Sequence, residues 1–277
     1  MKLDIKRQIE QLFAVLLAMI AWTISGCQHH AAQHSDEIPI YVYHDFAPFI
    51  INGNKTTDLS RLLVSKLRQK TGLNWILHIV PRTLLNQKLA RGEDVTILWA
   101  NSKWFGGQPG LLASKSILWD ADVIVYQPER AIIGQYPDAF KHKTFCGIEG
   151  HVYRHFSPLF VSGQMTRING DNYNDCINKL LQHEADVVQM EKSQILNAYQ
   201  QLIPDKIRQY SPNIDSFTRH MLLSPSYSHL LPQVNRVITQ LSSDQEWQQD
   251  LAAFGERDFI NLFDMKLEDL LKVHPLE

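Results

Sequence analysis

The side chains best suited to chemistry in this sequence are one acid and a few aromatic rings near the ends of apolar runs. Glu191 directly follows such a run, and Phe46, Trp99 and Trp119 lie close to the ends of others. A buried carboxylate needs a partner, so we expect Glu191 to face a cationic or hydrogen-bond-donating group of a ligand. Aromatic rings beside an acid suit an amine or a flat organic cation. Two alternatives stay open: Glu191, next to Lys192, could be an acid at a helix N-terminus, and both tryptophans could be core residues.

Other kinds of reactive site find little support. The Gly-x-Ser-x-Gly, His-Glu-x-x-His, Gly-x-Gly-x-x-Gly and phosphate-loop patterns are absent from the sequence. His151 and His155 have the spacing of a metal pair on a helix, but no third ligand matches, which favours surface or cleft histidines. The segment 171–175 resembles a calcium loop superficially; Tyr173 and Cys176 break that pattern, and a helix cap is favoured. We therefore expect no catalytic residue, no metal and no cofactor.

Composition excludes several classes of protein. The chain has 277 residues, with 27 Lys and Arg against 29 Asp and Glu, for a net charge of -2. This balance argues against a protein that binds nucleic acid through its backbone, which needs clustered cations. Three cysteines are too few for a disulfide scaffold. The length fits one large domain or two small ones.

The first 26 residues indicate an export signal. Three cations precede the apolar run 12–22, which as a helix rises only about 16 Å and is too short to span a bilayer core of about 30 Å. The segment 24–27, Ile-Ser-Gly-Cys, resembles the lipobox of bacterial lipoproteins, in which Cys27 is lipidated and becomes the first mature residue. The alternative is an ordinary secretory signal in which Cys27 has no role.

The polar segment 27–37 is then expected to be a flexible tether. Its three histidines could bind a metal, but a linker that happens to contain histidines is the simpler interpretation. Cys146 and Cys176 would remain after lipidation. An oxidising compartment would permit a disulfide between them, although the sequence does not show whether their geometry fits.

The body of the chain predicts two groups of alternating strands and helices. In the first group, strands 38–43, 75–80 and 95–99 are separated by a helix capped at Thr57 or Asp58 and ended by Gly72, and by a second helix opened by Pro81. This βαβαβ order favours a parallel sheet.

The second group repeats the design. It has strands at 144–148, 165–168 and 186–190, a helix at 152–162, and another helix capped by Asp171. Two apolar extended segments, 122–126 and 218–223, connect the groups, and helices are expected at about 227–241, 244–254 and 258–272. Two such connections form a hinge whose main motion closes a cleft.

This organisation resembles the periplasmic solute-binding proteins of the amino-acid type, family 3, which capture a small solute and pass it to an ABC importer. The resemblance covers about residues 40 to 255 and rests on the order and spacing of short markers. Those markers are Phe-Ala-Pro-Phe at 46–49 and the segments 89–94, 140–147, 150–153, 183–188 and 244–255.

The resemblance implies an α/β fold of the two-lobed periplasmic binding protein type II class. Each lobe would be a mainly parallel sheet flanked by helices, with a two-strand hinge. Residues 38–122 and 218–277 would form lobe 1, and residues 123–217 would form lobe 2.

Ligands of open α/β sheets bind outside the carboxyl ends of the strands. The residues expected there, on the two walls of the cleft, are Asp45, Phe46, Trp99, Asn101, Trp119, Gly150, His151 and Glu191.

The chain also departs from the family. Amino-acid binders of the family use an arginine shortly after the third strand to hold the ligand carboxylate, but segment 101–107 has none, and Lys103 stands three residues too early. His151 and Val152 replace small hydroxyl residues. We therefore expect a small organic solute, cationic or an amine, and weak binding of free L-amino acids.

Three functions compete. The first is a lipid-anchored periplasmic binding protein of a Gram-negative cell, serving the membrane permease of an ABC importer. The second is a sensor or accessory lipoprotein of the same fold that reports its solute to a membrane signalling protein. The third is a dehydratase-like enzyme with His44, Asp45 and Glu191 as acid–base groups, which the missing arginine disfavours. A further alternative is a degenerate domain whose cleft no longer binds a ligand.

Overall fold

The computed structural model describes residues 37–51, 57–106, 110–211 and 214–264. The predicted signal 1–26, the lipidation site Cys27 and all of the tether except Glu37 lie outside these residues. The described residues from Ile38 onward form one compact unit, and only this unit is considered below. None of the helices in the described ranges is long and apolar enough to cross a membrane.

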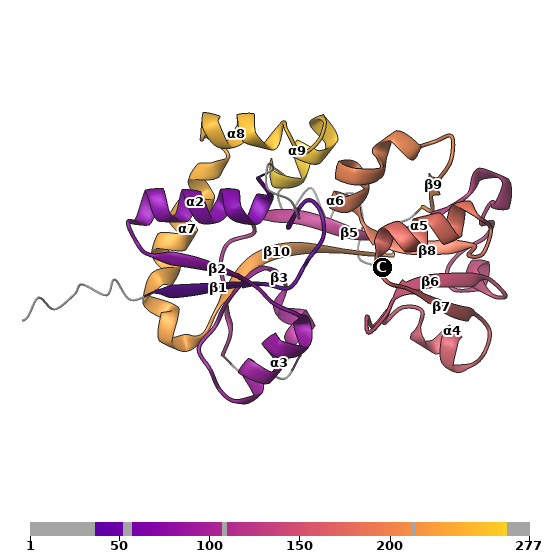
Figure 1. Ribbon diagram of the computed structural model, residues 1–277, viewed down its shortest axis with the longest axis horizontal. Coiled ribbons are helices and arrows are strands. Elements are labelled where there is room, and N and C mark those ends of the chain that lie inside the picture. Colours follow the sequence, from indigo (N-terminus) through magenta and orange to yellow (C-terminus); the bar gives the residue numbers. More distant parts are fainter. Residues whose placement is uncertain (1–36, 52–56, 107–109, 212–213, 265–277) are drawn as a thin grey trace, which may run out of the picture. The chain divides into compact units, whose positions relative to one another are not determined.

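The unit alternates strands and helices along most of its length (Figure 1). Its strands are β1 (Ile38–Val42), β2 (Trp75–Ile79), β3 (Thr96–Ala100), β4 (Leu112–Ala113), β5 (Leu118–Tyr126), β6 (Thr144–Ile148), β7 (Thr166–Gly170), β8 (Val187–Glu191), β9 (Arg208–Gln209) and β10 (Asp215–Leu223). Its α-helices are α2 (Leu59–Thr71), α3 (Arg82–Ala90), α4 (Ser157–Val161), α5 (Tyr173–Leu181), α6 (Lys192–Gln194), α7 (Leu231–Leu241), α8 (Gln245–Leu251) and α9 (Arg257–Asp264).

The first group of strands is parallel, as the βαβαβ order predicts. β1 pairs with both β2 and β3 in parallel. The helix between β1 and β2 begins where the sequence indicates: the Asp58 side chain accepts a hydrogen bond from the Arg61 amide at 2.8 Å. It ends at Gly72, whose φ of 69° is the left-handed conformation that glycine adopts without strain.

The second group repeats this arrangement, and two long strands join the groups. β6 pairs in parallel with β7 and β8. β5 and β10 pair antiparallel with each other, β10 also pairs with β3, and β5 also pairs with β8. The strand order β2-β1-β3-β10-β5-β8-β6-β7 therefore has one parallel group at each end and two connecting strands between them. The predicted α/β class, with two parallel groups of strands joined by two connecting strands, is confirmed.

Two local predictions are wrong. The helix expected over 152–162 is limited to Ser157–Val161, because Tyr153 turns inward before it. The Tyr153 hydroxyl accepts a hydrogen bond from the Ile148 amide at 2.8 Å, and its ring packs on Phe145 with 4.8 Å between centroids. The cap of α5 is Asn172 and not Asp171, since the Asn172 side chain accepts from the Asp175 amide.

Apolar side chains fill the space on both faces of these sheets. A large cluster joins β1, β2 and α2 to α7, α8 and α9, and it includes Trp75 and Trp247. Figure 1 shows α5 and α4 on opposite faces of the β6, β7 and β8 group, and a separate apolar cluster lies under each of them. Each parallel group thus has its own core.

A disulfide closes the second group. Cys146 of β6 is bonded to Cys176 of α5, with 5.5 Å between their Cα atoms. Gly170 is needed beside it, because a Cβ there would lie 2.8 Å from the Cys176 sulfur. The disulfide between Cys146 and Cys176, which the sequence left undecided, is therefore present, and it links α5 to the strand β6 that this helix covers.

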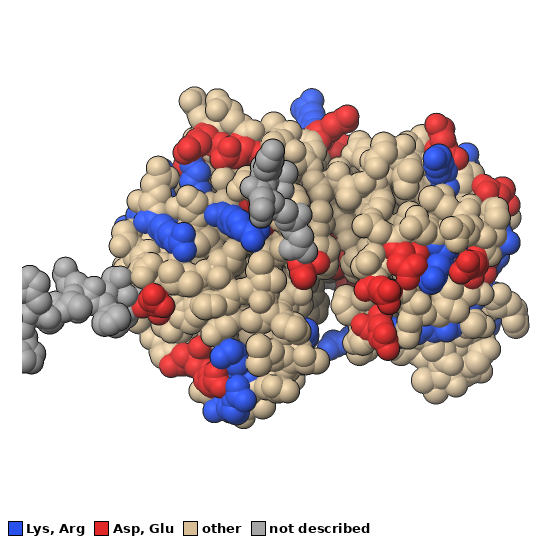
Figure 2. All heavy atoms as spheres, viewed as in Figure 1, with Lys and Arg blue, Asp and Glu red and all other residues tan. Residues whose placement is uncertain are grey.

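Charged side chains are dispersed over the visible surface. Figure 2 shows small mixed groups of basic and acidic residues, with no continuous field of one sign on that face. This distribution accords with the near-zero net charge of the chain.

Candidate functional site

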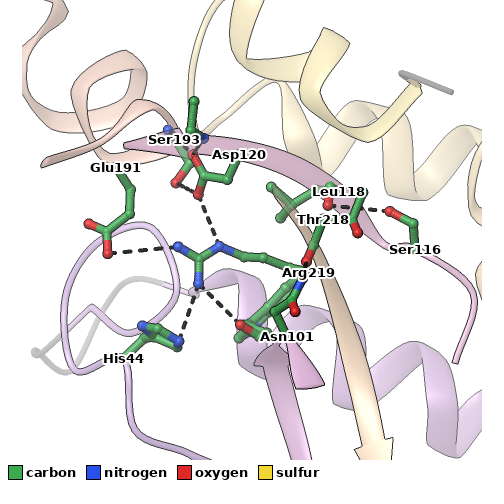
Figure 3. A network of polar contacts seen from close by, with 11 residues as sticks. His44, Asn101, Ser116, Leu118, Asp120, Glu191, Ser193, Thr218 and Arg219 are labelled. Carbon is green, nitrogen blue, oxygen red and sulfur yellow. Dashed lines mark hydrogen bonds and ion pairs between the residues drawn. The ribbon is translucent and has the colours of Figure 1, made fainter. Parts of the chain in front are cut away.

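Arg219 lies at the centre of the polar cluster that joins the two groups of strands (Figure 3). It belongs to β10, and its side chain is fully buried. The guanidinium Nε donates to Asp120 Oδ2 at 2.9 Å, and Nη1 donates to the Trp99 carbonyl oxygen at 3.1 Å. A buried guanidinium needs both a counter-ion and acceptors for its donors, and β5 and β3 supply them.

Asp120 is held on its other side by the segment that follows β8. Its Oδ1 accepts from the Ser193 amide at 2.9 Å, and its Oδ2 accepts from the Ser193 hydroxyl at 2.6 Å. The Asp120 carboxylate, itself fully buried, therefore joins the connecting strands to the second group of strands.

Glu191, at the end of β8, is the second acid near the guanidinium. Its Oε1 lies 3.8 Å from Arg219 Nη2, which is an ion pair but too long for a hydrogen bond. Within the described residues, neither Glu191 Oε2 nor Arg219 Nη2 has a hydrogen-bond partner, although both atoms are buried. Burial raises the pKa of Glu191 above its ordinary value, and the charge of Arg219 acts against this rise.

His44, just after β1, faces the same guanidinium. Its Nε2 lies 3.2 Å from Arg219 Nη1. Because a guanidinium only donates, His44 Nε2 must accept, which assigns the proton of the neutral ring to Nδ1. Burial, followed by the charges of Arg219 and Arg82, holds the pKa of His44 well below its usual range. His44 is therefore an acceptor here and adds no charge.

Aromatic rings enclose the charged groups. The Arg219 guanidinium carbon lies 4.6 Å from the centroid of Phe49, 5.2 Å from that of Phe217 and 5.3 Å from that of Trp104. Phe46 extends from the first group of strands to Tyr173 of α5, with 5.3 Å between ring centroids. These contacts bring the loop after β1 against the first turn of α5.

Three acids lie side by side across the strands of this region. Asp122 of β5 is the register partner of Glu191 on one side and of Asp215 on the other. Burial is the largest cause, followed by the charges of Glu191, Asp215 and Asp120, and together they raise the pKa of Asp122 from 3.8 to about 7. The Asp122 carboxyl therefore titrates near neutral pH.

The tryptophans and the asparagine expected at the site serve mainly the fold. Both Trp99 and Trp119 are buried in the apolar cluster of β1, β2 and α2, and Trp99 Nε1 donates to the Ser60 hydroxyl at 2.8 Å. Only the carbonyl of Trp99 reaches Arg219. Asn101 donates to the Thr218 carbonyl at 2.9 Å and accepts from the Lys103 amide at 3.0 Å, so both ends of its side-chain amide bond to main-chain groups.

The other expected residues lie at varied distances from the cluster. Phe46 is half-buried and contacts His44 at 5.5 Å between ring centroids, whereas Asp45 beside it is exposed. Gly150 and His151 form an exposed turn after β6. The structure therefore brings together Phe46, Glu191 and the carbonyl of Trp99. Asp45, Gly150 and His151 are more exposed, although, after burial and the charges of two arginines, the charge of His151 is near enough to lower the pKa of His44 further.

The main residue that sequence reasoning missed is Arg219, together with its partners Asp120 and Ser193. The signal was present: Asp120 and Asp122 alternate within the apolar strand 118–126, so both point to one face. On β10 the alternation places Arg219 on the same face as Asp215. One arginine and two acids on the same face of two paired strands indicate a buried ion pair.

This arrangement can hold charge, but it shows no sign of a metal centre. No group of three or more His, Cys, Asp or Glu side chains in the described part of the chain could hold a metal ion. Each guanidinium nitrogen of Arg219 lies near either a carboxylate, of Asp120 or Glu191, or a neutral acceptor, which is His44 or the Trp99 carbonyl. The site is therefore built to stabilise a planar cation among acids and rings.

Comparison with known proteins identifies structures of similar fold. No family model matches the chain, and no curated protein matches it in sequence. Among solved structures, holo ArgBP from T. maritima has a TM-score of 0.56 at 16% identity, over 76% of this chain and 92% of that chain. The GluR0 ligand-binding core from Nostoc punctiforme, in complex with (L)-glutamate, has a TM-score of 0.61 at 11% identity, over 78% and 98% of the two chains.

A further similar structure is the periplasmic VFT2 domain of Bordetella pertussis BvgS. Its TM-score is 0.53 at 20% identity, and the match covers 80% of this chain and 94% of that chain. All three matches span nearly the whole of the known domain. The chain therefore has the fold of the two-lobed type II periplasmic binding proteins, and the resemblance to the family 3 solute-binding proteins is confirmed at the level of the fold.

Proposed function

We propose that this protein is a solute-binding lipoprotein of the bacterial envelope that closes two lobes around a small organic molecule. The lobes would be residues 38–122 with 218–277, and residues 123–217. The observation that carries the proposal is the convergence of His44 and Glu191 on Arg219. These two residues follow or end β1 and β8, which lie on opposite sides of the connecting strands.

Closure is the expected means of capture. In open α/β sheets the ligand crevice lies outside the carboxyl ends of the strands, and both residues lie at such ends. A solute that contacts both walls favours the closed arrangement by its differential affinity for it. The acid–base candidates His44 and Glu191 are engaged with Arg219, so binding and not catalysis is proposed.

The proposed partner follows from the proposed localisation of the protein. A lipid on Cys27 would hold the domain at a bacterial membrane facing the periplasm, where a permease of an ABC importer could receive the solute. Replacing Cys27 by Ser should move the protein from the membrane fraction to the soluble periplasmic fraction. Retention of the variant in the membrane fraction would contradict the anchor.

A sensor lipoprotein is the second candidate. The observation that favours it is the similarity of the fold to the periplasmic VFT2 domain of BvgS. A neighbouring gene for a membrane signalling protein would support this candidate, whereas neighbouring permease and ATPase genes would support the importer.

A thermal-shift screen tests the binding role itself. Free L-amino acids, amines, peptides and aromatic solutes are each added to the purified domain. One class should raise Tm, because a ligand that binds only the folded state stabilises it. Free L-amino acids should act weakly, since segment 101–107 directly after β3 contains no arginine. If no class raises Tm, or if a standard amino acid gives the largest rise, the proposal or its ligand argument is wrong.

A further inference from the structure

We propose that Arg219 is the specificity-determining residue of this site: its guanidinium occupies the position of a solute cation between Asp120 and Glu191 and so excludes guanidinium and ammonium solutes. This inference rests on the proposed function, because it concerns the same cleft. It changes the ligand expected from sequence, where Glu191 was taken to need a cation from outside the chain.

The surroundings of Arg219 are those of a cation-binding site. The guanidinium has a carboxylate at 2.9 Å, a second carboxylate at 3.8 Å, and a carbonyl and a neutral imidazole nitrogen as further acceptors. Three aromatic rings lie within 5.3 Å of its central carbon. A free guanidinium bound here would meet the same carboxylates, acceptors and rings, and in this structure the chain itself supplies the occupant.

The hydrogen bonding of this ion pair is incomplete. Buried polar atoms in folded proteins are almost all hydrogen-bonded. Here Arg219 Nη2 and Glu191 Oε2 both lack such a partner in the described part of the chain, and the side chain of Arg219 is fully buried. Glu191 therefore faces a cation that is near enough for charge but not placed for a bond.

A second cation would be repelled at this position. It would lie within a few ångströms of Arg219, and like charges at that distance disfavour each other strongly in a dry site. Removal of the Arg219 side chain should reverse this preference, because it leaves a guanidinium-sized space lined by Asp120, Glu191 and the same rings.

The test is to empty the position and offer a free ion. The purified Arg219→Ala variant and the wild-type protein are titrated with methylguanidinium chloride by calorimetry, and Tm is measured in parallel. Methylurea serves as the neutral probe of the same shape. Arg130→Ala is the matched variant, because Arg130 also pairs with an acid, Asp186 at 3.0 Å, but this pair is partly exposed to solvent and lies outside the Arg219 cluster.

We expect methylguanidinium to bind Arg219→Ala at least tenfold more tightly than it binds wild type or Arg130→Ala. At ten times its dissociation constant it should raise the Tm of Arg219→Ala by about 4 °C. Methylurea should have no such effect. Equal binding to wild type and Arg219→Ala, or an equal response to methylurea, would overturn the proposal.

Arg219→Ala leaves two buried acids without a counter-ion and could fail to fold. The double variant Asp120→Asn with Arg219→Ala removes the tightest charge pair together and keeps Glu191. It should still prefer methylguanidinium over methylurea, and a lack of preference there overturns the proposal equally. Wild-type binding of some neutral or anionic solute is unaffected by either result, so the proposed function and this inference fail separately.

Discussion

Replacing Asp122 by Asn should make the stability of the protein less dependent on pH. Asp122 lies between Glu191 and Asp215 across three paired strands. Its pKa is about 7 in the folded protein, against an ordinary value of 3.8. Between these two values the folded protein binds a proton that the unfolded chain has released, so the free energy of unfolding falls as the pH rises through that window.

The size of this effect follows from the width of the window. From pH 5 to pH 7 the unfolded Asp122 is ionised and the folded one largely is not. Each pH unit in that range changes the free energy of unfolding by about 1.4 kcal/mol, so the wild-type protein should lose about 2 to 3 kcal/mol relative to Asp122→Asn by pH 8. In Tm this corresponds to a difference of several degrees.

Urea denaturation of both proteins at pH 5 and pH 8 measures the difference. Asp171→Asn is the matched control, because Asp171 is exposed and lies outside the row formed by Glu191, Asp122 and Asp215. The Asp122→Asn variant should gain stability relative to wild type at pH 8, while the control should follow wild type. If wild type and Asp122→Asn lose stability in parallel from pH 5 to pH 8, the carboxyl does not titrate as the strand pairing implies.

The remaining predictions concern the disulfide, the acid of β8 and a tightly packed glycine. Replacing both Cys146 and Cys176 by Ala should lower the free energy of unfolding by about 3 to 4 kcal/mol, since the bond closes a 30-residue separation; urea denaturation measures the loss, and a change below about 1 kcal/mol would refute the loop-closure estimate. Glu191→Gln should weaken binding of a screened solute about tenfold by calorimetry while Glu184→Gln on the surface does not; equal affinities would remove Glu191 from the binding site. Gly147→Ala should lower stability by about 2 kcal/mol, because its Cβ would lie 2.6 Å from the Tyr153 ring, whereas Gly106→Ala has space; similar Tm values for the two variants would argue against this close packing.

Much of the fold could be predicted because its signals are local. Asp58 and Gly72 mark the two ends of α2 through their own side chain and backbone, and the apolar runs of β1 and β3 need no distant partner to be recognised. The α4 region failed for the opposite reason. Tyr153 leaves the helical pattern because it packs beneath β6, a contact that its neighbours in sequence do not reveal.

In the candidate site, too, some residues could be predicted from local sequence and others could not. Glu191 was identifiable because an acid at the carboxyl end of an apolar strand points to a crevice. Its partner Arg219 lies 28 positions later on another strand, and only the pairing of β10 with β5 brings it beside Asp120. Trp99 shows the converse, since a tryptophan at a strand end gives the same pattern whether its ring faces a crevice or, as here, the core.

The antiparallel pairing of β5 with β10 has a consequence for how this chain can be divided. Asp122 and Asp215 are register partners, so the polypeptide goes out to β6 and comes back at neighbouring positions, with about 5 Å between their Cα atoms. The stretch between them is an insertion with adjacent ends, and a two-residue hairpin turn could join the host strands if it were excised. The same junction would accept a transplanted insert of different sequence while the host strands keep their pairing, which makes it a natural position for building chimaeras.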